Sequence, residues 1–228
     1  MTDFDRPFTE IQERFEQGEV KEHGLQDPKM RALIAIACLS AQQAREELKV
    51  KTAEALSAGC TVTEIKETMY HAGAYCGYPR IKDALAIVNE YLVSAGIDPN
   101  EEDQGTVNAD NRFEKGLDVQ VGIFGQGIIT SMEAAAPDVK HFRTFLSSNC
   151  FGDYYTRGTL DLKMRELITF TTIITIGGCE PQAKAHVRAN LNVGNTKQTL
   201  IDALTTCVPY IGYPRTLNAL ACIEDVCK

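Results

Sequence analysis

The sequence lacks several features that would identify common classes of protein. Among its 228 residues there is no tryptophan, no Cys-X-X-Cys pair and no His-X-X-X-His pattern, so we expect neither a zinc site nor another metal or cofactor. No run of 18 apolar residues occurs, and a membrane-spanning helix is therefore not expected.

An excess of positive charge is also absent. The chain has 23 Lys and Arg against 31 Asp and Glu, a net charge of −8, which argues against nucleic acid or an anionic membrane as a partner. The first residues, MTDFDRPFTEIQERF, are acidic where a signal peptide is basic and then apolar. We therefore expect a cytoplasmic protein in which the eight cysteines are thiols.

An internal repeat organises what is present. KMRALI at 29–34 returns as KMRELI at 163–168, and YCGYPR at 75–80 returns as YIGYPR at 210–215. The offset between the copies is 134 residues at the first pair (29 to 163) and 135 at the second (75 to 210). This pattern indicates a duplication. We predict a first repeat over 1–96, a polar linker over 97–110 and a second repeat over 111–228.

Both copies have the signals of helices. Apolar residues recur at helical spacing, and Gly177, Gly194 and Gly212 follow them where a helix would end. Thr61 with Glu64, and Asn195 with Gln198, have the spacing of helix-starting caps. Strand signals are short and unpaired, so the predicted fold class is all-α, a duplicated helical bundle.

Three segments of the second copy carry a resemblance to a known family. They are CFGDYYTRGTLDLKMREL from 150, HVRANLNVGNT from 186 and PYIGYPRTLNAL from 209. In this order they resemble the carboxymuconolactone decarboxylase family, which includes alkylhydroperoxidase D. The resemblance is strong over 150–225 and weaker over 29–95. It implies an all-helical fold and a ring-like homo-oligomer, commonly a homotrimer in two-repeat members.

The resemblance also implies site residues. Alkylhydroperoxidases use a Glu on one helix and a C-X-X-C-X-X-X-H run on the next; Glu166, Cys179 and His186 match the Glu, the first Cys and the His. Gln182 replaces the second Cys, and this departure favours the decarboxylase members, which do not depend on a cysteine pair. The first copy has Ala32, Ala44 and Lys51 at the three positions, so it lacks the candidate chemistry.

Glu166 and His186 on neighbouring helices would form a general acid/base pair, because a carboxylate that accepts one imidazole N–H makes the other nitrogen more basic. The alternative is a buried pair that serves packing alone. Cys179, placed at a helix N-terminus, is either a reactive thiolate or a small residue in a helix contact. Cys150 is a candidate resolving thiol or a core residue.

Candidates for binding a substrate carboxylate are Arg157 and Arg165, with Tyr210 as a pocket residue. Charges of this kind also form solvated faces or inter-subunit salt bridges. His71 and His141 have no evident partner, and we expect both at the surface.

Three functions follow. The first is a lyase, a decarboxylase that uses His186 and Glu166 on a small carboxylated lactone-like substrate. The second is thiol-dependent, alkylhydroperoxidase or peroxiredoxin activity through Cys179, with Cys150 or an external thiol reductant as the resolving partner. The third is a non-catalytic oligomeric scaffold. The sequence favours the first and leaves the substrate open.

Overall fold

The computed structural model describes residues 5–228. Residues 1–4, which begin the acidic stretch discussed above, lie outside the described residues. Every regular element from residue 5 onward is helical, which confirms the all-α prediction. The elements are α1 (Arg6–Arg14), the π-helical η2 (Phe15–Val20), α2 (Lys21–His23), α3 (Pro28–Gln42), α4 (Arg45–Ser57), α5 (Val62–Cys76), α6 (Tyr78–Ser94), α7 (Arg112–Phe124), α8 (Gly127–Glu133), α9 (Lys140–Phe145), the π-helical η3 (Leu146–Tyr155), α10 (Leu162–Ile176), α11 (Glu180–Asn192) and α12 (Lys197–Val226).

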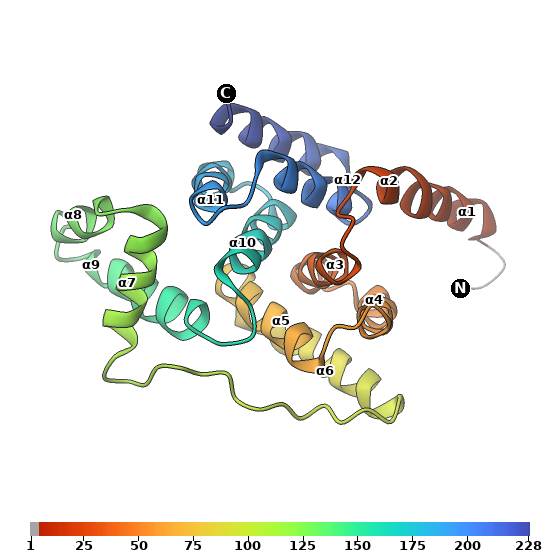
Figure 1. Ribbon diagram of the computed structural model, residues 1–228, viewed down its shortest axis with the longest axis horizontal. Coiled ribbons are helices and arrows are strands. Elements are labelled where there is room, and N and C mark those ends of the chain that lie inside the picture. The colour runs from red at the N-terminus through yellow and green to blue at the C-terminus, as the bar shows by residue number, and fades with distance from the viewer. Residues whose placement is uncertain (1–4) are drawn as a thin grey trace.

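The sequence repeat is visible in the order of the helices. Helices α3 and α4 correspond to α10 and α11, and the pair α5–α6 corresponds to the two halves of α12. The halves of α12 meet at Gly212, whose φ of 72° and ψ of 166° interrupt the helix. In Figure 1, α10 lies near the middle of the molecule, and it packs against α3, α5, α11 and α12.

Local signals account for most helix ends. Asp27 and Asp161 cap α3 and α10 by accepting from the backbone N–H three residues on. Thr61 and Glu64 form the predicted capping box. The predicted cap at Asn195 and Gln198 is displaced by one residue, because Thr196 takes the extended conformation and pairs with Thr199.

One hydrophobic core runs through both repeats. Its fully buried members come from α3, α5, α10 and α12 alike, among them Ile34, Ile65, Ile168 and Leu200. The repeats therefore stabilise each other, since each buries its apolar face on the other.

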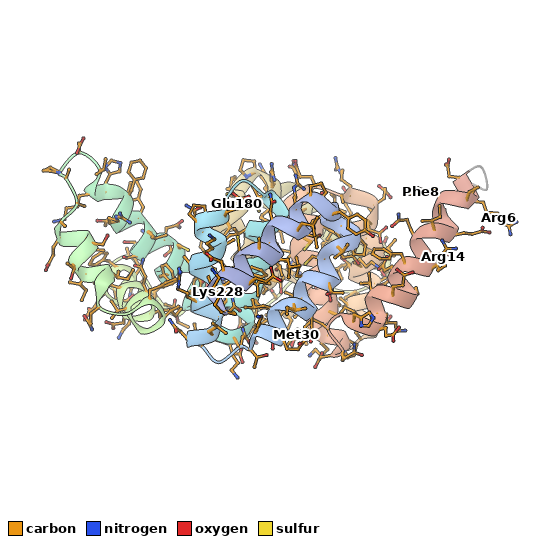
Figure 2. The ribbon with its side chains drawn as sticks, turned by 90° about the horizontal axis from the view of Figure 1, so that it is seen from above. Arg6, Phe8, Arg14, Met30, Glu180 and Lys228 are labelled. Atoms are coloured by element: carbon orange, nitrogen blue, oxygen red, sulfur yellow. The ribbon has the colours of Figure 1, made fainter. Side chains whose placement is uncertain are left out.

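A second, smaller body projects from one end. Helices α7, α8 and α9 with η3 form it, at the left of Figure 1, and an extended segment after α6 leads to it along one side of the molecule. Figure 2 shows α1, with Phe8 and Arg14 labelled, at the opposite end. No helix of the described residues has the length and hydropathy needed to cross a membrane.

Candidate active site

The structure joins Glu166 of α10 to His186 of α11. Glu166 Oε2 lies 2.8 Å from His186 Nδ1, and Glu166 Oε1 accepts a 2.7 Å hydrogen bond from the hydroxyl of Tyr155. Asn190 Nδ2 donates to the main-chain oxygens of both Glu166 and His186, at 2.9 and 2.7 Å, and so fixes one helix against the other.

The environment of the pair sets its protonation. Glu166 is fully buried and has two donors, which is the environment of a carboxylate that remains charged. A carboxylate accepts only, so His186 carries its proton on Nδ1. The other ring nitrogen, Nε2, then keeps its lone pair. His186 is the exposed member of the pair, at 9%.

His186 lines a cavity of about 520 Å³ between α5, α7, η3 and the start of α11. The rings of Tyr75 and Phe124 meet the imidazole edge-on, with centroids 5.6 and 5.5 Å away. Much of the wall is apolar, and Arg143 of α9 is a charged residue on the lining; no Asp or Glu of the described residues lines it. The cavity thus combines one base, one cation and apolar walls.

Both cysteines singled out from the sequence reach this cavity. Cys179 is half-buried and is the N-cap residue of α11, at the predicted helix start. Cys150 is buried in η3 with its Sγ 3.5 Å from the Tyr75 hydroxyl. Burial raises the pKa of the Cys150 thiol to about 12, so this thiol is protonated at neutral pH.

The arginines predicted to bind substrate lie elsewhere. Arg157 forms a salt bridge of 2.8 Å with the buried carboxylate of Glu67 in α5. Arg165 is fully buried; it lies 3.6 Å from Glu67 and donates to main-chain oxygens of Leu160, Arg157 and Gly158. Neither lines the cavity of His186. Their role in the structure is to pair a buried carboxylate and to hold the loop before α10.

Tyr210 is also not in this cavity. Its hydroxyl donates to Glu16, 3.0 Å away, in a second cavity in the first repeat. Tyr75, its counterpart in the other copy, occupies the place expected for it beside His186. The tyrosine of each copy therefore serves the cavity of the other copy.

The cavity of the first repeat has different chemistry. Lys51 stands where His186 stands in the second repeat, and its ammonium pairs with Glu16 at 2.5 Å and with Glu54 at 3.0 Å. These carboxylates hold the pKa of Lys51 above its usual value against the effect of burial. No equivalent of the Glu166–His186 pair exists there, because Ala32 replaces Glu166.

Sequence reasoning missed Tyr75, Tyr155 and Arg143. Tyr75 was obscured by its counterpart in the other copy, and the π-helical turn that aims Tyr155 at Glu166 has no sequence signal. The expectation of a surface position for His71 was wrong, because His71 is fully buried between α5 and α10; His141 is exposed as expected. Among the described residues, no group of three or more His, Cys, Asp or Glu side chains forms a metal-binding cluster.

Comparisons with known proteins agree with this architecture. The model of the carboxymuconolactone decarboxylase family matches residues 7–90 and 141–225, one stretch in each half of the chain. The 4-carboxymuconolactone decarboxylase of Acinetobacter baylyi is 28% identical over 123 residues, which are 54% of this chain and 91% of that protein. The nitrosuccinic acid decarboxylase of Metarhizium robertsii is 33% identical over 100 residues, 44% of this chain and 69% of that protein.

A solved structure has the same fold. It is described as a gamma-carboxymuconolactone decarboxylase subunit from Burkholderia xenovorans and superposes with a TM-score of 0.54 over 97% of this chain and 86% of that chain, at 20% identity. The helical repeats and the matched sequence define a carboxymuconolactone decarboxylase-type protein. The chain belongs to the carboxymuconolactone decarboxylase family and is an enzyme of that family.

Proposed function

We propose that the chain is a decarboxylase for a small carboxylated substrate, related to a lactone or a nitro acid, with His186 as the proton-transfer residue. One observation carries the proposal: the Glu166–His186 pair presents its free imidazole nitrogen to a cavity that contains an arginine and no carboxylate. The relatives named above support it, since both are decarboxylases by name.

The residues fit the proton requirement of the reaction. Loss of CO2 breaks a carbon–carbon bond and leaves its electron pair on the substrate, which then takes up one proton. Protonated His186 supplies that proton from Nε2, while Nδ1–H stays bonded to Glu166. The charge of Glu166 stabilises the imidazolium that forms before each transfer.

The cavity wall contributes binding. The guanidinium of Arg143 is suited to hold a carboxylate or nitro group of the substrate through two parallel hydrogen bonds. The apolar wall near His186, which includes Phe124 and Phe151, keeps water from the reacting carboxylate. Positions of the substrate on this wall follow from the two polar ends, Arg143 and His186.

The experiment is an assay of CO2 release from 4-carboxymuconolactone and from nitrosuccinate, with the wild type and three variants. We expect His186→Ala and Glu166→Gln to lose roughly 100-fold or more in kcat, as expected for loss of a positioned acid/base group. Cys179→Ser, in the same cavity, should retain activity within about threefold, because thiol chemistry is not needed.

The opposite pattern identifies the thiol-dependent alternative. If the wild type reduces organic hydroperoxides, Cys179→Ser abolishes that activity and neither acid releases CO2, the decarboxylase proposal is wrong. The replacement of the second alkylhydroperoxidase cysteine by Gln182 and the protonated state of Cys150 are the observations that favour the decarboxylase.

A further inference from the structure

A buried hydrogen-bond network continues from Glu166 away from the cavity. Tyr155, which donates to Glu166, lies 2.9 Å from the hydroxyl of Thr169. Thr169 Oγ1 lies 2.9 Å from His71 Nε2, and His71 Nδ1 lies 3.3 Å from Arg165 Nη1. All five side chains are nearly or fully inaccessible to solvent.

The donors and acceptors permit one assignment of the protons. A guanidinium only donates, so His71 Nδ1 accepts from Arg165, and neutral His71 carries its proton on Nε2. His71 therefore donates to Thr169, whose own proton is directed to Tyr155. The Tyr155 proton goes to Glu166. Each bond points toward the carboxylate.

We propose that His71, Thr169 and Tyr155 are positioning residues, a one-way chain of hydrogen bonds from Arg165 to Glu166 that fixes the proton of His186 on Nδ1 and leaves Nε2 free toward the cavity. This inference rests on the proposed function, in which that nitrogen transfers the proton. Glu166 accepts at one oxygen from the chain and at the other from His186, so its two oxygens have separate partners.

The protonation states agree with this direction. Burial, with the charge of Arg165, holds the pKa of His71 well below its usual value, so the ring is neutral. Burial and the neighbouring Glu166 hold the pKa of Tyr155 well above its usual value, so the phenol keeps its proton. His71 comes from α5, which means that the first repeat supplies part of the support for a site in the second.

Other groups face His186 and are constant in the test. They are Tyr75 from α5, Cys150 from η3, Cys179 before α11 and Arg143 from α9, all on the lining of the same cavity. The test therefore changes a residue of the chain that contacts neither His186 nor the cavity, Thr169.

The experiment is histidine-selective 15N NMR of the full-length protein, which has only four histidines. We expect His71 as the Nε2–H tautomer without titration between pH 5 and 8, and His186 as the Nδ1–H tautomer at neutral pH. Thr169→Val removes one donor to Tyr155, weakens the Tyr155–Glu166 bond and leaves more negative charge on Glu166. The pKa of His186 should then rise by about half a pH unit.

The matched control is Thr172→Val on the same helix. Thr172 is equally buried, but its hydroxyl donates to the main-chain oxygen of Ile168 and is outside the chain, so the titration of His186 should be that of the wild type. Thr169→Ser keeps the hydroxyl and should also restore it. Far-UV circular dichroism checks that all three variants are folded.

Two results would overturn the inference: an Nδ1–H tautomer for His71, or identical His186 titrations in Thr169→Val and Thr172→Val. The NMR readout needs no substrate, so it separates the two proposals. A shifted His186 without CO2 release from any acid contradicts the decarboxylase and leaves the chain intact, whereas CO2 release with an unshifted His186 contradicts the chain alone.

Discussion

Arg143 differs from the other arginines near the site in having no carboxylate partner among the described residues. Arg157 and Arg165 both face the buried Glu67, whereas Arg143 lies on the cavity lining, where no Asp or Glu is present. A guanidinium in this setting is available to an anionic ligand. We therefore assign substrate binding to Arg143 in place of Arg157 and Arg165.

This assignment predicts a separation of kinetic constants. Arg143→Gln should raise KM for a carboxylated substrate roughly 10- to 100-fold with little change in kcat, because it removes binding that ground state and transition state share. Lys140→Gln, which removes the same charge from the same short helix but not from the cavity lining, should leave KM unchanged. Steady-state kinetics measure both, and an equal rise in KM for the two variants would contradict a specific contact.

The sequence predicted the Glu166–His186 pair because two helices with recognisable starts and stops bring these positions together. It did not predict the place of Arg165. Its partner Glu67 lies in the other repeat and is itself buried, and no local pattern around Arg165 indicates that contact. A charged residue beside a catalytic Glu in the sequence is thus a poor guide to substrate contact when the opposite helix face holds a buried carboxylate.

At the scale of elements, the closest approach in the molecule is between α7 and η3. A Cβ added to Gly116 of α7 would lie 1.9 Å from the main-chain oxygen of Ser147 and 2.4 Å from the nitrogen of Gly152. Both atoms belong to the backbone of η3 and cannot rotate away. This contact positions Gln120 and Phe124 of α7 against Cys150 and Phe151 of η3, which together line the cavity.

We predict that Gly116→Ala lowers the free energy of unfolding by about 1–3 kcal/mol or more, as overpacking of a close contact does. Gly122→Ala in the same helix has nothing within 4 Å of the added carbon and should raise stability by roughly 0.5–1 kcal/mol, because alanine is the better helix former. Urea unfolding of both variants measures the difference. Equal stabilities would mean that α7 moves away from η3 without cost.

The elements themselves were largely predictable, and their exchange between repeats was not. Caps such as Thr61–Glu64 and the break at Gly212 follow from local chemistry, which the sequence displays directly. The exchange that brings Tyr75, and not Tyr210, to His186 depends on how the two copies pack against each other. Spacing within one copy contains no information on that arrangement.

At the scale of the whole molecule, the interface between the repeats contains a buried ionisable group that responds to pH. His71 of α5 packs against α10 with its imidazole fully buried and its pKa well below the model value of 6.5, owing to burial first and to Arg165 second. The unfolded chain binds a proton at this residue near pH 6.5, and the folded protein does not. The free energy of unfolding therefore decreases as pH falls below about 6.5.

The last prediction measures that contribution. Each pH unit below about 6.5 should remove up to about 1.4 kcal/mol of stability through His71 alone, so the wild type should unfold at lower urea at pH 5 than at pH 7.5. His71→Gln keeps a side-chain N–H donor without a titrating group, and it should lose less stability over the same interval. His141→Gln, at an exposed position on α9, should lose as much as the wild type. If His71→Gln also loses as much as the wild type, the acid sensitivity of the fold arises elsewhere and His71 takes up its proton without opening the interface between the repeats.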